Sequence, residues 1–247
     1  MKLVLLRHGE SEWNLQNRFT GWKDVSLTKT GIEEATFSGN QLLKEGIKFI
    51  SVYTSLLNRA IETTEIVTKI INFPKNSIKY DWRLNERHYG ALQGLNKSDT
   101  ASKYGEEQVH IWRRSYDIAP PSLDIDDARH PRFNRKFDII DGELPVGESL
   151  KNVIERLDPF WVDYVQFLIK EKGNHLIVAH SNSLRAIIKV LEKLSDTEIT
   201  SVNIPTGIPL IYSLDPFSLT VISKEYMVEG DKLKEKQELI ANQGKAK

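Results

Sequence analysis

Two histidines in the sequence follow short apolar runs and could act as nucleophiles. His8 comes shortly after the run at residues 3–6, and His180 follows the run at 175–179. Continuous apolar runs of this length are typical of buried parallel strands, and ligands bind where such strands end. A single histidine at a strand end could be a solvated loop residue. Two of them at equivalent strand ends predict one crevice that both side chains enter.

Basic residues lie close to both histidines in the sequence. Arg7 precedes His8, and Arg59 stands at the start of an expected helix. Arginine binds phosphate through two parallel hydrogen bonds, and helix N-termini add backbone N–H donors. Because the chain has 34 basic and 34 acidic residues, an anion site has to arise from such local clusters. The pattern predicts a small polyanionic substrate, with Arg185 mainly a solvated charge.

Phosphoryl transfer through a nucleophilic imidazole fits these residues. A neutral His8 could attack phosphorus and carry the phosphoryl group, and nearby arginines penalise the competing imidazolium form. If protonated, His180 could donate to the same phosphoryl oxygens. A carboxyl group must then move the proton of the attacking or departing hydroxyl, and Glu86 and Glu10 are the candidates. Glu10 could equally serve as a structural hydrogen-bond acceptor.

Metal and thiol chemistry fit the sequence less well. The chain has no cysteine, which excludes disulfides, thiolate catalysis and cysteine-based zinc sites. No two histidines are spaced as in His-x-x-x-His, and arginines around the expected site would repel a cation. We therefore predict that the site uses no metal.

The composition is that of an ordinary globular protein. The chain has 247 residues, of which 40% are hydrophobic and 28% charged, and this length allows a substantial core. A formal net charge of zero gives no global attraction to nucleic acid or to an anionic membrane. The run at 3–6 is too short for a signal peptide, and no stretch approaches the roughly 18 apolar residues of a membrane span. We expect a cytoplasmic protein.

Strand and helix patterns alternate along the chain and predict one α/β layered domain over residues 1–247. Thr30 to Glu33 matches a capping box and should open a helix through about Lys44. A long amphipathic helix should cover about 150–168, with Pro159 kinking or splitting it. The other expected strands span 49–53, 78–82, 210–214 and 219–223, and the other expected helices span 58–71 and 184–194.

Two segments lack such a pattern. Residues from about 105 to 147 contain Pro120, Pro121 and mixed charges, which predicts an irregular active-site insertion. Long structureless segments in compact domains are usually functional or disordered. The last residues, about 229–247, are charged and poorly patterned, so we expect a mobile tail there.

Longer motifs around these residues resemble one protein family. The segment from Arg7 to Asn14 reads RHGESEWN and resembles the signature of the histidine phosphatase superfamily. Further blocks resemble the cofactor-dependent phosphoglycerate mutases and follow the order of that family across nearly the whole chain. They lie at residues 19–22, 54–60, 85–90, 112–116, 182–186, 203–207 and 241–245.

The resemblance implies a three-layer α/β/α fold with a mostly parallel sheet. It also implies a glycolytic isomerase that interconverts 3-phosphoglycerate and 2-phosphoglycerate without a metal. In that family 2,3-bisphosphoglycerate primes the enzyme by loading a phosphoryl group on the histidine that matches His8. Family members are commonly dimers or tetramers, and we expect a homodimer.

The resemblance also assigns roles by position. His8 would carry the phosphoryl group, Glu86 would donate and accept the proton, and His180 would stabilise the transferring group. Arg7 and Arg59 complete the expected catalytic set. The residues expected to contact substrate are Arg7, His8, Gly9, Glu10, Ser11, Asn14, Thr20, Gly21, Arg59, Glu86, Arg87, His88, Tyr89, Lys97, Arg113, Arg114, Ser181 and Asn182.

One departure from the family lies beside the second histidine, and it bears on the fit of the ligand. Ser181 stands where the family usually has glycine. Its side chain could crowd the ligand or add a hydroxyl contact. No catalytic side chain is lost by this change.

A phosphatase of the same superfamily is the nearest alternative, because water could attack the phosphohistidine in place of a hydroxyl group. The mutase-type blocks at 85–90 and 112–116, with a tail that could close the site, favour transfer. A bisphosphoglycerate synthase is a subtype alternative. A non-catalytic binding protein would have lost a nucleophile, a proton-transfer group or an arginine, and none is missing.

Overall fold

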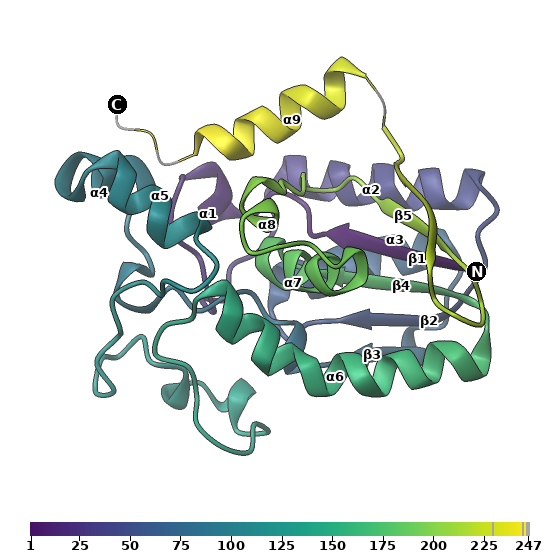
Figure 1. Cartoon of the computed structure of the whole chain (residues 1–247), viewed down its shortest axis with the longest axis horizontal. Coiled ribbons are helices and arrows are strands. Elements are labelled where there is room, and N and C mark those ends of the chain that lie inside the picture. Colours follow the sequence, from purple (N-terminus) through teal and green to yellow (C-terminus); the bar gives the residue numbers. More distant parts are fainter. Residues whose placement is uncertain (229, 244, 246–247) are drawn as a thin grey trace.

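The computed structural model, which describes residues 1–228, 230–243 and 245, is built around one six-stranded sheet (Figure 1). The strand order across the sheet is β3-β2-β4-β1-β5-β6. The four strands from β3 to β1 are parallel, and β5 pairs antiparallel with β1 and with β6. The bounds are β1 (Lys2–Arg7), β2 (Phe49–Thr54), β3 (Ile78–Tyr80), β4 (Asn174–Ala179), β5 (Leu210–Leu214) and β6 (Val221–Tyr226).

The two central strands are buried on both faces, which explains why they read as unbroken apolar runs. In β1, Leu3 and Leu5 belong to one hydrophobic cluster, whereas Val4 and Leu6 belong to another. This alternation follows from the two-residue period of a strand. A parallel strand covered on both faces cannot expose polar residues until it ends, and in β1 it ends at Arg7.

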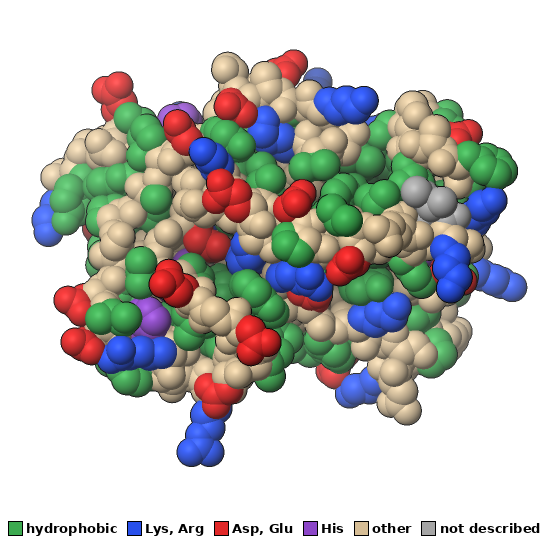
Figure 2. Space-filling model, turned by 60° about the horizontal axis from the view of Figure 1, so that its bottom comes forward, with side chains coloured by type: hydrophobic (Ala, Val, Ile, Leu, Met, Phe, Trp, Pro, Cys, Tyr) green, Lys and Arg blue, Asp and Glu red, His purple; other side chains and the backbone are tan. Residues whose placement is uncertain are grey.

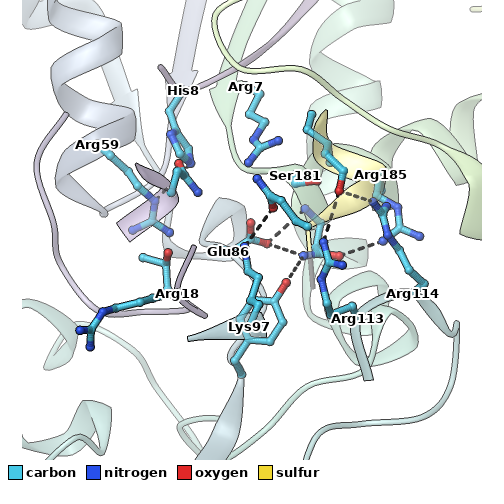
Figure 3. Close-up of a pocket in the computed structure, with 16 residues that line it drawn as sticks. Arg7, His8, Arg18, Arg59, Glu86, Lys97, Arg113, Arg114, Ser181 and Arg185 are labelled. Atoms are coloured by element: carbon cyan, nitrogen blue, oxygen red, sulfur yellow. Dashed lines mark hydrogen bonds between the residues drawn. The ribbon is translucent and has the colours of Figure 1, made fainter. Parts of the chain in front are cut away.

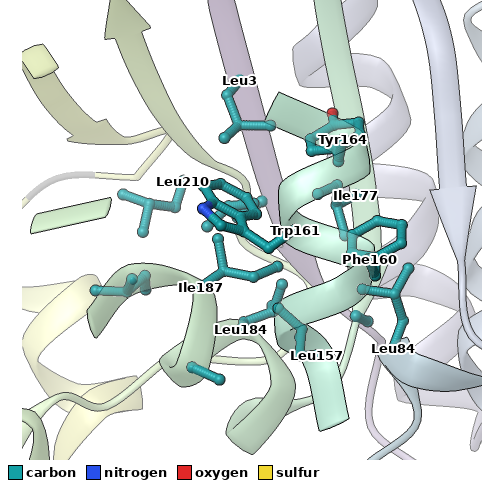
Figure 4. Close-up of a cluster of buried hydrophobic side chains, with 14 of the residues drawn as sticks. Leu3, Leu84, Leu157, Phe160, Trp161, Tyr164, Ile177, Leu184, Ile187 and Leu210 are labelled. Atoms are coloured by element: carbon teal, nitrogen blue, oxygen red, sulfur yellow. The ribbon is translucent and has the colours of Figure 1, made fainter. Parts of the chain in front are cut away.

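Helices cover both faces of the sheet and complete three layers (Figure 1). On one face lie α2 (Lys29–Lys44) and α3 (Asn58–Ile70), whose Leu42 and Val67 pack against strand residues. On the other face lie α6 (Leu150–Glu171) and α7 (Ser181–Glu192), whose side chains fill the larger cluster (Figure 4). The expected α/β/α class with a mostly parallel sheet is confirmed.

Several predicted boundaries were wrong for local reasons. Helix α2 is capped by Thr28, whose side chain accepts from the Gly31 amide, and not by Thr30. Helix α6 continues through Pro159 instead of splitting there. Helix α7 begins at Ser181, directly after His180, and not at residue 184. This first turn lacks the apolar pattern of a helix, because Ser181 and Asn182 line the pocket and the Ser183 hydroxyl accepts from the His180 amide.

The segment from 105 to 147 is only partly irregular. Its first part forms α5 (Glu106–Arg114), which follows α4 (Lys97–Tyr104). Between residues 115 and 147 the regular structure consists of two short 3-10 helices, η4 (Pro131–Phe133) and η5 (Arg135–Phe137). The prediction of a wholly irregular insertion was therefore wrong at its start.

The charged tail contains a helix that the sequence pattern did not indicate. Residues 231–242 form α9 (Asp231–Asn242), which crosses one end of the molecule and finishes near α4 and α5 (Figure 1). Whether this helix moves stays a prediction, and positions 229, 244, 246 and 247 lie outside the described residues. The remaining short elements are α1 (Glu12–Leu15), α8 (Glu198–Ser201), η1 (Lys75–Ser77), η2 (Trp82–Leu84) and η3 (Gly90–Leu92).

Charge is spread over the surface without a dominant sign. On the face shown in Figure 2, basic and acidic side chains are interspersed among apolar ones. Among the described residues, no helix is both long and apolar enough to cross a membrane.

Candidate active site

The pairing of β1 with β4 brings the two histidines together. Arg7 lies opposite Ala179 in the parallel register, and the amide of His8 donates to the Ala179 carbonyl at 3.0 Å. The next residue on each strand is therefore a histidine. The imidazole ring centres of His8 and His180 lie 5.0 Å apart, as two equivalent strand ends require. This juxtaposition was predicted from the apolar runs.

The hydrogen bonds of His8 fix which ring nitrogen is nucleophilic. Nδ1 lies 2.7 Å from the carbonyl oxygen of Gly9, which can only accept, so Nδ1 carries the proton. Nε2 is then unprotonated and accepts from Nε of Arg59 at 3.2 Å. Burial is the main cause that holds the pKa of His8 well below its usual range, and Arg59 and Arg7 lower it further. The imidazole is therefore held in its nucleophilic neutral form.

His180 is also neutral in this arrangement. Burial is the largest cause that lowers its pKa well below the usual range, followed by the positive charge of Arg59. Its Nε2 lies 2.7 Å from Oγ of Ser55, while Nδ1 is buried without a partner. An arriving phosphate dianion would favour the protonated form, because an opposite charge raises the pKa of a nearby imidazole. Donation by His180 thus has to be coupled to anion binding.

Glu86 is the carboxylate of the site, and its hydrogen bonds converge on one oxygen. Oε1 accepts from the amide of Asn182 at 3.1 Å, from its Nδ2 at 2.9 Å and from the Arg87 amide at 2.8 Å. This arrangement fixes the carboxylate and leaves Oε2 to exchange a proton with a ligand. The side chain is 7% exposed and lines the same pocket as His8.

Backbone carbonyls aim the two arginines next to His8. Nη2 of Arg59 donates to the Gly21 carbonyl at 2.9 Å, and Nη1 donates to that of Lys23 at 3.1 Å. Nη1 of Arg7 donates to the Ile204 carbonyl at 2.8 Å, whereas its buried Nε has no partner. Both guanidinium groups are thus oriented before a ligand arrives, which is the preorganisation that phosphoryl transfer requires.

A second group of cations forms the opposite wall, beneath α9. Lys97 donates from Nζ to Oε1 of Gln243 at 3.0 Å. Arg113 and Arg114 each reach the carbonyl of Ile240, at 3.4 and 3.5 Å. Helix α9 therefore forms a roof over the pocket, and its polar atoms partner cations that a bound anion would also attract.

Basic side chains dominate the pocket (Figure 3). Seven of them line it together with one carboxylate, that of Glu86. Burial, with a further contribution from Arg114, lowers the pKa of Arg113 to about 10, and burial followed by the charge of Arg113 lowers that of Lys97. Such crowding is costly in the empty pocket and is relieved by an anion with several negative charges. The seven are Arg7, Arg18, Arg59, Lys97, Arg113, Arg114 and Arg185.

Most of the residues predicted to bind substrate line this one pocket. The structure brings them together from both strand ends, from the 85–90 segment and from α4 and α5. His180 does not line the pocket but lies directly behind it, against His8. Those that line it are Arg7, His8, Asn14, Thr20, Arg59, Glu86, Tyr89, Lys97, Arg113, Arg114, Ser181 and Asn182.

The other predicted residues support the site from outside the pocket. Gly9 passes so close to Gly31 that an added Cβ would lie 2.2 Å from the Gly31 carbonyl oxygen. Glu10 accepts from Oγ1 of Thr28, which favours its structural interpretation. Ser11 caps α1 through Asn14, and Gly21 accepts from Arg59.

Arg87 and His88 also lie behind the pocket wall. Arg87 is buried against the Tyr89 ring and donates to the Arg113 carbonyl at 3.0 Å. The ring of His88 is fully buried, and its Nδ1 accepts from the Gly90 amide at 3.1 Å. The structure therefore assigns both side chains a supporting position rather than a place in the pocket lining.

Four lining residues were missed from the sequence. Arg185 was interpreted as solvated, but it is 1% exposed and donates to Oδ1 of Asn182 at 3.0 Å. The three-residue spacing between them on α7 could have indicated this contact, because residues i and i+3 share a helix face. Gln243 lies in the family block at 241–245 but was given no role, whereas Arg18 and Ile240 carried no comparable local signal, since loop and tail packing bring them to the site.

Among residues 1–228, 230–243 and 245, no group of three or more potential ligands lies close enough to hold an ion. Glu107 and His110 have a Glu-x-x-His spacing on α5, but no third ligand joins them there. Their helix faces the cationic pocket, where a metal cation would be repelled.

The fold and this site place the chain in a known superfamily. The model of the histidine phosphatase superfamily (branch 1) matches residues 3–216, so the chain belongs to that superfamily. A solved mycobacterial glucosyl-3-phosphoglycerate phosphatase superposes with a TM-score of 0.67 at 22% identity, covering 86% of this chain and 92% of that one. The alpha-ribazole phosphatase of Shigella flexneri gives 0.63 at 21% identity, with 90% and 95% covered. At these identities the likeness shows the fold alone.

Curated phosphoglycerate mutases are much more similar in sequence to this chain than these two solved phosphatases are. The 2,3-bisphosphoglycerate-dependent phosphoglycerate mutase of Xylella fastidiosa is 53% identical over 247 residues, which cover 100% of this chain and 99% of the relative. The chain is therefore a member of the phosphoglycerate mutase family. The family predicted from the motifs is confirmed.

Proposed function

We propose that the protein interconverts 3-phosphoglycerate and 2-phosphoglycerate through a phosphohistidine at His8 that 2,3-bisphosphoglycerate primes. The observation that carries the proposal is the unprotonated Nε2 of His8 in a pocket with seven basic side chains and one carboxylate. A monophosphoglycerate carries a phosphate and a carboxylate, and the bisphosphate carries one more phosphate. Two cationic walls suit a ligand with charge at both ends.

In the loading step, His8 attacks a phosphorus atom of the bisphosphate. A bond forms between Nε2 and phosphorus while the ester P–O bond breaks, and Glu86 gives its proton to the departing alkoxide. Arg7 and Arg59 neutralise the charge on the transferring oxygens. His180 lies behind His8 and outside the pocket lining, so its donation to the same oxygens requires that binding of the dianion both protonates the ring and gives it access to the ligand.

In the transfer step, the protonation roles reverse. Glu86 removes the proton from a hydroxyl group of the bound monophosphate, whose oxygen then attacks the phosphorus on His8. The bisphosphate formed in this way must turn or rebind before the other phosphoryl group loads the enzyme. Lys97, Arg113 and Arg114 hold the end of the ligand that does not react, and their charges serve either orientation.

Exclusion of water separates transfer from hydrolysis in this scheme. The roof helix α9 contacts the cationic wall through Ile240 and Gln243, so it narrows access to the phosphohistidine. An open site would admit water as the nucleophile, and the same residues would then act as a phosphatase. Closure by α9 is therefore part of the proposal.

A coupled assay tests the function directly. With 3-phosphoglycerate as substrate and enolase as the coupling enzyme, 2,3-bisphosphoglycerate should stimulate turnover, and EDTA should not abolish it. Release of inorganic phosphate should be slow relative to coupled turnover. Absence of coupled turnover with rapid phosphate release would instead establish the phosphatase alternative.

Assembly and location complete the proposal. The protein forms a homodimer, with a homotetramer as the alternative, and acts in the cytoplasm. The support for both is membership of the phosphoglycerate mutase family. Sedimentation equilibrium at micromolar concentration distinguishes the assemblies, and a monomer would contradict the dimer.

A further inference from the structure

The segment that carries Glu86 is buried but lacks regular structure. Residues 82–84 form η2, and the chain from 85 to 89 belongs to no helix or strand. Its backbone carbonyls cannot be satisfied by a ladder, and an unpaired buried carbonyl is costly. The groups that satisfy them also determine where the Glu86 carboxylate lies.

Arg156 of α6 supplies these partners from behind the segment. Its Nη1 donates to the Arg83 carbonyl at 2.7 Å, and its Nη2 donates to the carbonyls of Asn85 and Glu86 at 3.2 and 3.4 Å. The side chain is 7% exposed, so water does not compete for these carbonyls. One guanidinium group thus holds the backbone that leads into Glu86, up to the carbonyl of Glu86 itself.

Glu148 completes the support. It forms a buried ion pair with Arg156, in which Nε donates to Oε1 at 2.7 Å. Its Oε2 accepts from the His88 amide at 2.7 Å, and its own amide donates to the His88 carbonyl at 2.8 Å. The segment is therefore held before Glu86 by Arg156 and after it by Glu148.

Two tryptophans keep this ion pair in place. The guanidinium carbon of Arg156 lies 5.7 Å from the ring centre of Trp22 and 5.9 Å from that of Trp82. Nε1 of Trp22 also donates to the Glu86 carbonyl at 2.6 Å. A planar guanidinium packs against aromatic rings and can donate to several acceptors at once. A lysine ammonium packs less well against the rings and cannot donate in the same fixed geometry.

We infer that Arg156 and Glu148 are a positioning pair for proton transfer by Glu86. Neither residue lines the pocket, so neither touches the substrate. On the pocket side, Asn182 binds the carboxylate directly, while Arg156 and Glu148 hold its backbone from the opposite side. The inference rests on the proposed role of Glu86 as the group that donates and accepts the proton.

The expected effect depends on the leaving group. The alkoxide of glycerate departs only with a proton, so its departure depends on Glu86, whereas nitrophenolate departs without one. A shift of the carboxylate by about 1 Å is enough to cost on the order of 100-fold in rate. Loss of the positioning pair should therefore slow alkyl phosphate cleavage much more than aryl phosphate cleavage.

The test compares two donors in the same protein sample. Arg156→Lys keeps the charge but loses the fork, and Glu148→Gln keeps the shape but loses the charge. For each variant, phosphoenzyme formation is timed with 2,3-bisphosphoglycerate and with p-nitrophenyl phosphate. The ratio of the two rates, in which the folded fraction cancels, should fall about 10- to 100-fold, with KM for the bisphosphate little changed.

Two further variants distinguish a failure of the positioning inference from a failure of the proposed proton transfer by Glu86. Leu42→Ala removes a buried side chain of α2 away from the pocket, and it should lower stability while leaving the ratio unchanged. Glu86→Gln should lower the ratio most. If Glu86→Gln leaves the ratio unchanged, the proposed proton transfer itself fails. If only Glu86→Gln lowers it, Arg156 and Glu148 merely stabilise the fold and the inference is overturned.

Discussion

The floor and the roof of the pocket are built in opposite ways. The floor consists of Arg7 and His8 at the end of β1, with His180 at the end of β4 directly behind it, and every residue of β1 after Lys2 is buried. The roof is α9, in which none of the described side chains is buried. Elements with few buried contacts open at low free-energy cost, whereas core strands open only with global unfolding. We therefore expect the chemistry to take place on the part that stays closed, and access to it to depend on α9, the part expected to open at low cost.

The contacts of the roof agree with this contrast. Lys236 of α9 pairs with Glu34 of α2, and Gln237 donates to the Asn203 carbonyl at 3.4 Å. This ion pair is partly buried, and the other contacts named for the roof are single hydrogen bonds, each of which contributes about 0.5–1.5 kcal/mol. On the floor, by contrast, five consecutive residues of β1 pair with β4 in register. Only the floor is fixed by the sheet itself.

The largest effect is expected on the floor, from Glu86→Gln. The amide keeps an oxygen that can accept from Asn182, so the fold should change little, by less than about 1 kcal/mol of unfolding free energy. It cannot exchange a proton, so kcat should fall by roughly 10²- to 10⁴-fold. Coupled kinetics and urea unfolding of the same samples provide the check. A near-normal kcat would return Glu86 to a structural role.

Removal of the roof should change the partition of the reaction more than its chemistry. Deleting residues 236–247 takes away Ile240 and Gln243 and opens the cationic wall to water. The ratio of phosphate release to transfer should rise by about tenfold, which corresponds to roughly 1.4 kcal/mol between the two barriers. Phosphate release and coupled turnover are measured on one preparation. An unchanged ratio would show that α9 does not exclude water.

The lowered pKa of His8 on the floor predicts that the stability of the fold depends on pH. Because burial lowers the pKa of His8, its unfolded form takes up a proton near pH 6.5 while the folded form stays neutral. The contribution of His8 to the free energy of unfolding is therefore fully present above about pH 6.5 and decreases as the pH falls below that value. NMR titration of the ring, assigned with His8→Ala, should show no protonation near pH 6.5. A midpoint near 6.5 in the folded protein would contradict the assigned neutral state.

The smallest effect on the reaction is expected from Ser181→Gly, beside His180 in the pocket wall. Ser181 is the first residue of α7 and lines the pocket, but its side chain is only partly buried. Glycine costs a helix at most about 1 kcal/mol, and the first turn tolerates it better than the interior. KM for 3-phosphoglycerate should stay within about threefold, or roughly 0.6 kcal/mol, which is near the lower end of the 0.5–1.5 kcal/mol that a hydrogen bond to one hydroxyl contributes. A much larger change would make the serine a specificity determinant.

The same contrast explains how much could be predicted from the sequence. The floor was predictable because an apolar run followed by Arg7 and His8 is a local pattern, and parallel strand ends must meet. The family motifs supplied Glu86 and the cationic wall. A tail that could close the site was expected from the sequence, but its contacts were not predictable in this way, because they join residues far apart in the chain, such as Lys97 and Gln243.

Buried charges show a second limit. Arg185 and Arg156 look like solvated charges in the sequence, yet they are enclosed because carbonyls of distant segments accept from them. A sequence pattern records periodicity, but it does not record which carbonyls a fold leaves unpaired. Helix α5 was not predicted for a related reason. It is short and mostly polar, and its buried residues are Val109 and two arginines.

The central claim is that His8 carries the phosphoryl group and passes it to a hydroxyl group rather than to water. The most direct measurement loads the protein with 2,3-bisphosphoglycerate labelled on phosphate, then adds unlabelled 3-phosphoglycerate. We expect an acid-labile label that maps to His8, is absent in His8→Ala, and moves into phosphoglycerates during the chase. A label that persists in His8→Ala, or that leaves wild-type protein as inorganic phosphate during the chase, would contradict the account.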